Sequence, residues 1–328
     1  MDRPDRSQDD DVQWVEPRSE RRSEPSVAVR DDVDEEPVQQ GSISQFVLPL
    51  GLFGLTVFTT LWAGAFQAYS GPLRGPWDFL VAHPDRLWTG LPFAGTLLFI
   101  LVTHELGHYL LSRLHQVPAS LPLFIPGPPH LIGTFGAVIR LRGPIMDRRA
   151  LFDIGVSGPL AGFAVALAAL VIGMSLSTVV DRSGSFGLQL GEPLLLQFVS
   201  WVVIGSLPPQ ADVLLHPVAF AAWFGLFVTS MNLIPIGQLD GGHVAYALWG
   251  RRQRTMALAL FPILLMLGFV GWPGWFLWAF MAGAFGLGHP PVANPGAPLG
   301  RARVCVGWIA LAVFVLTFAP VPFSFHSR

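Results

Sequence analysis

The sequence contains no lysine, a single cysteine and unusually little charge. Of its 328 residues, 13% are charged, compared with roughly 25% in soluble domains. By contrast, 52% are hydrophobic. This balance excludes an ordinary water-soluble globule and a wholly disordered chain. Because the hydrophobic residues occur in long runs, the composition predicts a protein that crosses a membrane several times.

The lone cysteine, Cys305, excludes an intramolecular disulfide bond and any cysteine-rich metal site. It lies in an apolar run near the end of the chain. In that setting we interpret it as a small apolar helix residue.

Charge is concentrated in residues 1–42, which hold 13 of the 22 acidic residues but 6 of the 20 basic ones. This segment has no apolar core, so it does not resemble a secretory signal peptide, and it is too acidic for an organellar transit peptide. It also cannot bury enough apolar surface to fold alone. We therefore predict a disordered acidic tail over residues 1–42, with docking or regulation as an alternative role, and a transmembrane domain over residues 43–328.

The apolar runs predict an all-α polytopic membrane protein with about six to seven transmembrane helices, because a spanning helix needs about 20 apolar residues. A long run over 255–287 is broken at Trp272-Pro273-Gly274, which favours two short spans over one. A weaker apolar stretch, 194–207, is interpreted as interfacial or re-entrant. The other predicted spans are 45–69, 88–113, about 155–179, about 217–236 and 304–322.

Arginines indicate the orientation, because basic loops stay on the cytoplasmic side of a membrane. They cluster between the second and third spans, after the fourth span and before the last one, at residues 113, 140, 142, 148, 149, 251, 252, 254, 301 and 303. We expect these loops and the N-terminal tail to be cytoplasmic. The same count places the C-terminus outside.

The segment 118–143 is not predicted to be helical, since it carries five prolines followed by several glycines. Alternation near its end predicts a short membrane-associated strand or β hairpin near 130–143. Non-helical backbone at membrane depth is tolerated only where protein covers it or where it lines a water-filled cavity. We therefore prefer a sheet element over a cavity to a plain surface loop.

The second predicted span contains His104-Glu105-Leu106-Gly107-His108. Two histidines four residues apart lie on one helix face. This spacing lets both imidazoles bind one zinc ion, and the intervening Glu105 can act as a general base. Ionisable groups inside an apolar helix are unfavourable unless they have a partner or a function. The alternative is a histidine–glutamate network that only packs helices.

A catalytic zinc ion usually takes three protein ligands, so a third must come from elsewhere. Glu105 and Asp240 are the acids well inside apolar segments. Asp240 follows the fourth span at its cytoplasmic end, on the side that the second span also reaches. His243 is a competing ligand, and helix capping is an alternative role for Asp240.

Other ionisable residues receive no role in the predicted site. Asp153 follows two arginines and is interpreted as a surface partner or a helix cap. The remaining histidines lie in loops or at interfaces, at positions 83, 115, 130, 216, 289 and 326.

These motifs together resemble the site-2 protease family of intramembrane zinc metalloproteases. The resemblance lies in the H-E-x-x-H within a span and in the later N-x-x-P-x-x-x-L-D-G, formed by Asn232, Pro235, Leu239, Asp240 and Gly241. It extends to G-P-L-A-G over 158–162 and to the closing pattern of H-P-P at 289–291, L-G-R at 299–301 and F-A-P-V-P-F at 318–323. The closing pattern recurs in prokaryotic members and plastid relatives. The resemblance covers about residues 45–323.

The resemblance implies that His104, His108 and Asp240 bind Zn²⁺ and that Glu105 is the catalytic base. It also implies that Asn232 helps to hold the substrate or the oxyanion, although a helix-packing asparagine is an alternative. No loop exceeds about 40 residues, which is too short for the PDZ domain that many members carry.

We therefore predict a zinc metalloendopeptidase that cleaves membrane proteins in or near a transmembrane segment, in regulated intramembrane proteolysis. We expect it in the lipid bilayer of a prokaryotic plasma membrane, with no nucleic-acid partner. A substrate helix must unwind before cleavage, because its peptide bonds are hidden in its own hydrogen bonds. Addition of the extended segment as a strand at 133–142, with Gly133 and Gly136 as substrate-binding residues, would hold it.

Two other classes of function are alternatives to the protease. A zinc or proton transporter would scatter its ionisable groups along a path, often on repeated halves of the chain. A non-catalytic membrane scaffold would not explain the ligand spacing. The single compact set of His104, Glu105, His108 and Asp240 favours the protease.

Overall fold

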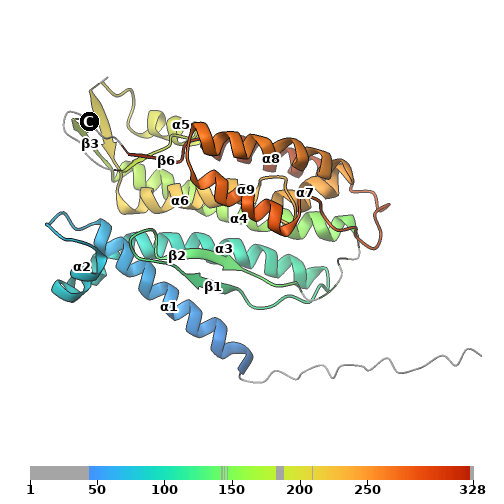
Figure 1. Cartoon of the computed structure of the whole chain (residues 1–328), viewed down its shortest axis with the longest axis horizontal. Helices are drawn as coiled ribbons and strands as arrows, with labels where there is room; N and C mark the ends of the chain where they lie inside the picture. The colour runs from blue at the N-terminus through green and yellow to red at the C-terminus, as the bar shows by residue number, and fades with distance from the viewer. Residues whose placement is uncertain are drawn as a thin grey trace, which may run out of the picture. The chain divides into compact units, whose positions relative to one another are not determined.

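The computed structural model describes residues 44–141, 143, 145, 147–181, 188–208 and 210–325. The predicted tail, 1–42, lies outside these residues. The described chain is mostly helical (Figure 1). Its helices are α1 (Ser44–Gln67), α2 (Pro76–Ala82), the 3-10 helix η1 (Pro84–Gly90), α3 (Leu91–Leu114), α4 (Arg148–Ser175), α5 (Leu194–Val203), α6 (Pro217–Asn232), α7 (Asp240–Trp249), α8 (Arg252–Val270), α9 (Gly274–Phe285) and α10 (Arg301–Thr317).

Four helical segments of the described chain are long and apolar enough to cross a membrane: Phe46–Gln67, Pro84–Leu114, Arg148–Ser175 and Arg252–Val270. The predicted count of six to seven is not reached by length and composition. The predicted span 217–236 falls short because its helix, α6, ends at Asn232 after 16 residues. The predicted break at Trp272-Pro273-Gly274 is confirmed, since α8 ends at Val270 and α9 begins at Gly274.

The helices α3, α4 and α6 pack together and form the centre of the structure. Their shared core contains Leu97, Ile100, Leu170, Trp223 and Leu226, all buried. A methyl group at Gly225 of α6 would meet the Ile100 side chain of α3 at 2.8 Å, so a small residue lets these helices approach closely.

The crossing of α3 and α4 depends on two glycines, Gly107 within the H-E-x-x-H motif and Gly158 on α4. A methyl group at Gly107 would come within 2.7 Å of the Ser157 carbonyl oxygen, and one at Gly158 would overlap the His108 ring. Glycine lets two helix backbones approach closely. The G-P-L-A-G motif therefore brings α4 directly against the histidine face of α3.

The structure contains an antiparallel pair, β1 (Leu123–Pro126) with β2 (Thr134–Val138), of which only β2 lies within the predicted range 130–143. The strand β1 contacts α1, and β2 contacts both α1 and α3, so the hairpin lies against these two helices (Figure 1). Its position between two candidate spans is consistent with the rule that non-helical backbone needs cover.

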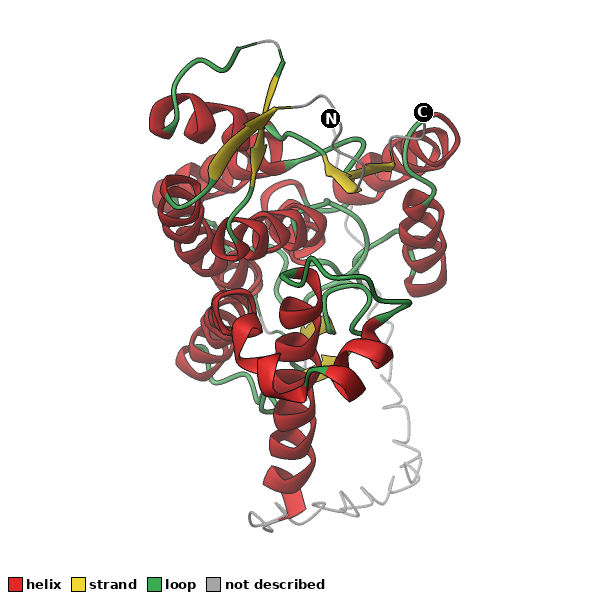
Figure 2. Cartoon of the chain, turned by 90° about the vertical axis from the view of Figure 1, so that its left-hand side faces the viewer, coloured by secondary structure: helices red, strands yellow, loops and turns green. Residues whose placement is uncertain are grey.

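Two further antiparallel pairs were not predicted from the sequence. They join β3 (Thr178–Asp181) with β5 (Ala211–Leu214), and β4 (Leu188–Leu190) with β6 (Phe323–Phe325). Figure 2 shows these short strands among the helices. Strands of three or four residues are too short to produce a clear alternation of apolar and polar residues.

Candidate functional site

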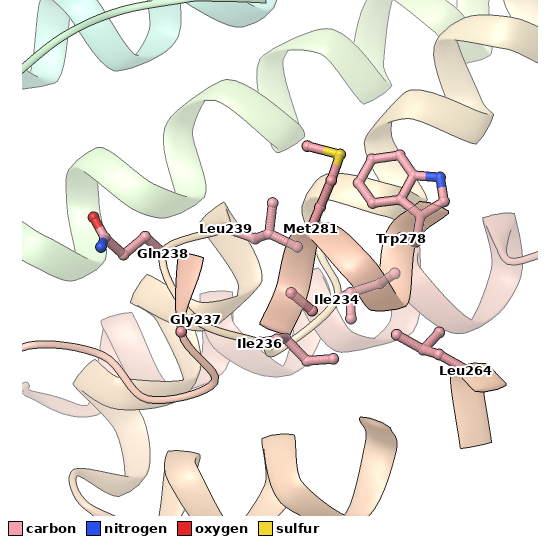
Figure 3. Close-up of a pocket in the computed structure, with 10 residues that line it drawn as sticks. Ile234, Ile236, Gly237, Gln238, Leu239, Leu264, Trp278 and Met281 are labelled. Carbon is pink, nitrogen blue, oxygen red and sulfur yellow. The ribbon is translucent and has the colours of Figure 1, made fainter. Parts of the chain in front are cut away.

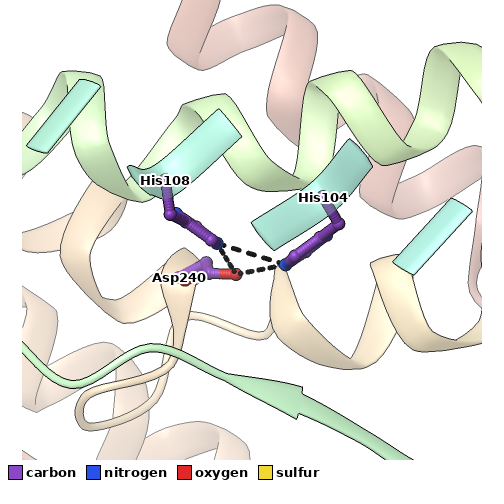
Figure 4. A group of neighbouring side chains, drawn as sticks. All are labelled: His104, His108 and Asp240. Atoms are coloured by element: carbon purple, nitrogen blue, oxygen red, sulfur yellow. Dashed lines mark hydrogen bonds and ion pairs between the residues drawn. The ribbon is translucent and has the colours of Figure 1, made fainter. Parts of the chain in front are cut away.

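Three side chains from distant parts of the chain converge at the centre of the helical core. His104 and His108 project from α3, and Asp240 from the start of α7 (Figure 4). The two Nε2 atoms lie 3.1 Å apart. Asp240 Oδ2 lies 3.4 Å from His104 Nε2 and 3.3 Å from His108 Nε2. Within the described residues, these three form the group that could hold a metal ion.

The spacing of these atoms fits a single zinc ion. A tetrahedral ion bound at about 2.0–2.1 Å holds its ligand atoms about 3.3–3.4 Å apart. The three measured separations, 3.1, 3.3 and 3.4 Å, lie close to that value. Two imidazole nitrogens and one carboxylate oxygen are also a common donor set for catalytic zinc. The chemistry and the geometry of the group therefore agree.

A backbone carbonyl on α4 orients His108. The Nδ1 atom lies 2.7 Å from the carbonyl oxygen of Ile154. Because a carbonyl oxygen can only accept, Nδ1 carries the proton and donates it, which leaves the Nε2 lone pair free toward the group. The missing side chain at Gly158 makes room for this ring orientation.

Glu105 lies beside the group in the buried part of α3. It is close enough to interact electrostatically with His104, His108 and Asp240. No hydrogen bond to its carboxylate is found within the described residues. Its oxygen lone pairs are therefore available to a water molecule or a substrate.

Asn232 is the last residue of α6, and its amide reaches the same point. The Asn232 Nδ2 atom lies 3.3 Å from His104 Nε2. A side-chain amide here can direct a hydrogen bond at a group held near the two histidines. The structure thus brings together Asn232 and four other predicted site residues, His104, Glu105, His108 and Asp240.

Asp240 lies in the first turn of α7, and the neighbouring residues determine the direction of its carboxylate. The cap of this helix is Leu239, and no side chain caps the helix by a hydrogen bond. The Asp240 carboxylate faces the histidines instead. Side chains at Gly241 and Gly242 would collide with the carbonyl oxygens of Leu233 and Gly237, so the two glycines let the loop fold beneath the helix start.

His243, the competing third ligand, lies outside the three-residue group. Its Nδ1 atom lies 2.7 Å from His289 Nε2. His289 Nδ1 faces the carbonyl oxygen of Pro290, so Nδ1 carries the proton and Nε2 accepts one from His243. Burial lowers the pKa of His289, which favours this neutral ring.

The two predicted substrate-binding glycines have different surroundings. Gly133 has a positive φ of 76° and lies against α1, where its carbonyl oxygen accepts a hydrogen bond of 2.6 Å from Thr59 Oγ1. Gly136 has a φ of 98°, with open space around it on β2. The hydrogen bonds and ion pairs of the described residues do not join either glycine to the metal-ligand group.

Sequence reasoning missed an ion-pair cluster next to the site. Arg303 of α10 donates two hydrogen bonds to Asp153, at 2.8 and 2.7 Å. His115, at the end of α3, lies 2.9 Å from the same carboxylate. Asp153 directly precedes Ile154, whose carbonyl orients His108. The arginine comes 150 positions later, and no local pattern connects the two.

Comparison with known proteins gives the family. Residues 92–270 match the family described as Peptidase family M50. The chain belongs to this family. Peptidase family M50 is the site-2 protease family, so the resemblance seen in the motifs is confirmed.

The relatives are named as zinc enzymes. The chain is 30% identical over 285 residues to a protein named "Probable zinc metalloprotease EGY2, chloroplastic" of Arabidopsis thaliana. This match covers 84% of this chain and 49% of that protein. It is 32% identical over 298 residues to "Probable zinc metalloprotease EGY1, chloroplastic" of the same plant, covering 84% and 53%. The chain thus spans about half the length of these curated relatives. No solved structure matches.

The relatives are named as zinc enzymes, and His104, His108 and Asp240 form a group that could hold such an ion. The match over residues 92–270 includes all of His104, Glu105, His108, Asn232 and Asp240. All five residues that the structure brings together therefore lie within the segment that matches the family.

Proposed function

We propose that this chain is a zinc metalloendopeptidase that hydrolyses peptide bonds in or near the transmembrane segments of membrane proteins, as a step of regulated intramembrane proteolysis. The convergence of His104, His108 and Asp240 on one point, with Glu105 beside them inside apolar helices, carries this proposal. Membership of Peptidase family M50 supports it.

In the proposed mechanism, His104 Nε2, His108 Nε2 and an oxygen of Asp240 hold the ion. Bound there, zinc polarises the scissile carbonyl group and lowers the pKa of a water molecule toward about 7. Glu105 takes a proton from the attacking water and passes it to the leaving amine. Its buried position and free lone pairs suit this transfer. Proton transfer by a positioned side chain contributes about 10²–10⁴-fold to the rate.

Asn232 has the position for stabilising the oxyanion. Its Nδ2 atom, 3.3 Å from His104 Nε2, could donate a hydrogen bond to a substrate oxygen beside the ligand group. Loss of such a donor typically costs about 2.7–4 kcal/mol of transition-state stabilisation. The same amide could also hold the substrate backbone.

The substrate must be extended when it reaches the site, because a helix hides its peptide bonds. The strand β2 pairs with β1 on one side and has no second strand partner among the described residues. Strand addition at that free edge would fix an extended segment by main-chain hydrogen bonds. The open space around Gly136 is consistent with β2 as the receiving strand. Gly133, just before β2, is held by its hydrogen bond from Thr59 of α1.

We propose that α6, α9 and α10 complete a set of six to seven spans around the four long ones. The helix α6 is roughly 24 Å long, shorter than a hydrocarbon core of about 30 Å. It suits a discontinuous span whose unwound end lies inside the protein, as at the binding sites of many transporters. The arginine-rich loops and residues 1–42 then lie in the cytoplasm.

The proposed location is the plasma membrane of a prokaryote, based on the resemblance to prokaryotic family members. The plant relatives carry the word chloroplastic in their names.

Cleavage of a helical membrane reporter tests the proposal. Purified chain in lipid vesicles should cut the reporter, and Glu105→Gln should lower the rate about 10²–10⁴-fold while zinc stays bound. Glu192→Gln, at an exposed residue before α5, is the matched control and should keep the wild-type rate. Cleavage that survives in Glu105→Gln would exclude Glu105 as the base.

A further inference from the structure

Asp240 is presented by a loop that borders a cavity on one side. Residue 234 and residues 236–239 border an apolar cavity of about 190 Å³, which is also lined by Leu264 of α8 and by Trp278 and Met281 of α9 (Figure 3). A cavity supplies no packing contacts to the residues that line it. The loop is held partly by the buried apolar cluster of Ile234 and Ile236 with Leu264 and partly by polar contacts elsewhere.

One such support is the segment 286–290, here called the strap, which connects α9 to the chain leading to α10. Gly237 of the Asp240 loop donates a backbone hydrogen bond of 3.1 Å to the Leu287 carbonyl oxygen. Gly237 and Gly286 both have positive φ, of 56° and 89°. A side chain at Gly237 would collide with the Gly286 carbonyl oxygen, so the two backbones are in direct contact.

Gln253 of α8 ties the strap and the loop together. Its side chain is fully buried. Its Nε2 atom donates to the carbonyl oxygens of Pro235 and Leu287, each at 3.2 Å. Its Oε1 atom accepts from the His289 backbone at 3.1 Å. One amide thus connects three segments, and a buried amide that lost these partners would carry an unsatisfied polar group.

The strap also reaches α7 on the other side of Asp240. His289 Nε2 lies 2.7 Å from His243 Nδ1, one helical turn after Asp240. The His289 ring stacks on Tyr246 with the ring centres 4.6 Å apart and an angle of 26°. Contacts from Gln253 and His289 therefore bracket Asp240 from both directions along the chain.

We propose that Gln253 and His289 are positioning residues that hold the Asp240 carboxylate against the two histidines. This inference rests on the proposed function, in which Asp240 is a zinc ligand. His104 and His108 are fixed by the interior of α3, whereas Asp240 stands at the junction of a loop and a helix. Residues that hold a ligand in place typically change metal affinity about 10–100-fold when they are removed.

The test uses the purified full chain and measures zinc affinity by competition with a chelator. Gln253→Met keeps the side-chain length and removes all three hydrogen bonds. We expect zinc affinity to fall about 10–100-fold. The absorption spectrum of the Co²⁺-substituted protein should also change, because it reports ligand geometry. Gln197→Met, the same change at an exposed residue of α5, is the control and should alter neither readout.

His289→Phe is the second variant, in case Gln253→Met does not fold. Phenylalanine can still stack on Tyr246 but cannot bond to His243, so a fall in zinc affinity isolates that bond. We expect a smaller loss than in Gln253→Met, because the backbone bond from residue 289 to Gln253 is kept.

A double-mutant cycle with Asp240→Ala tests whether Gln253 and His289 affect zinc affinity through Asp240. If the strap acts through Asp240, the effects of Gln253→Met and His289→Phe should disappear once Asp240 is alanine. The positioning role would be excluded if these effects persist when Asp240 is alanine, or if both single variants keep the wild-type zinc affinity. Neither result would contradict the proposed function. Unchanged affinity in Asp240→Ala itself would instead remove Asp240 from the ligand set, which is a failure of the proposed function.

Discussion

The metal-ligand group has two halves that the fold supports by different means. His104 and His108 lie inside a helix of 24 residues, and their relative position follows from the helical repeat. Asp240 begins a helix of 10 residues after an irregular loop, and its position depends on contacts with α8 and with residues 286–290. Local geometry defines the first half, and long-range contacts define the second. Four predictions test this difference.

Removal of the metal should have the largest effect and should show the asymmetry directly. Chelation should abolish cleavage of a membrane reporter, and added zinc should restore it. A ligand at 100 times its Kd stabilises a fold by about 2.7 kcal/mol. Hydrogen exchange should therefore speed up on chelation, mainly over residues 233–243 and much less in α3. Equal loss of protection in both segments would contradict the asymmetry.

Gly158→Ala, on the neighbouring helix α4, should displace the ring of the ligand His108. The added methyl group would overlap the His108 ring, so the ring must move away from Ile154 and Asp240. Zinc affinity should fall about 10–100-fold, as it does when an orienting contact is lost. Gly95→Ala on α3 is the matched control, because a side chain there meets open space. It should stabilise the chain by about 0.4–1 kcal/mol.

Asp153→Asn should also affect the part of the site that holds the two histidines, but it should lower zinc affinity less than Gly158→Ala does. The change removes the charge that Arg303 and His115 share at the junction of α3, α4 and α10. Because Arg303 is partly exposed, we expect a loss of about 1 kcal/mol of unfolding free energy. Zinc affinity should change only a few-fold. Thermal unfolding and chelator competition measure the two quantities, and Asp85→Asn, an exposed acid of η1, should change neither.

Thr59→Ala should have the smallest effect and should leave both halves of the metal group intact. It removes the bond from α1 to the Gly133 carbonyl oxygen, worth about 0.5–1.5 kcal/mol. If β2 receives the substrate, KM should rise with little change in kcat. Thr103→Ala, whose hydroxyl bonds only within α3, is the control. A fall in kcat at constant KM would argue against the hairpin as a substrate support.

The sequence predicted best what short-range patterns encode. The histidine pair on one helix face, the break at Trp272-Pro273-Gly274 and the hairpin between the second and third spans follow from spacing, proline and glycine. The predicted span count is not confirmed by length and composition, because hydropathy does not reveal where a helix ends, as α6 does at Asn232.

The supports of the candidate site were beyond sequence reasoning because they join distant residues through backbone atoms. Gln253 bonds to the carbonyl oxygens of Pro235 and Leu287, which any residue type would offer. His289 was assigned no role, although it belongs to the closing pattern of the family resemblance. Asp153 was interpreted as a surface partner or cap, and its partners come from α3 and α10.

The order of these segments along the chain has a consequence for biosynthesis. The histidines are made first, Asp240 follows much later, and residues 286–290, with the proposed hold on Asp240, come later still. A ribosome releases the chain in that order. On the proposed positioning role, a nascent chain cannot assemble a firm metal site until most of its membrane domain has been synthesised. Under the proposed function, cleavage would therefore begin only after most of the membrane domain has been made.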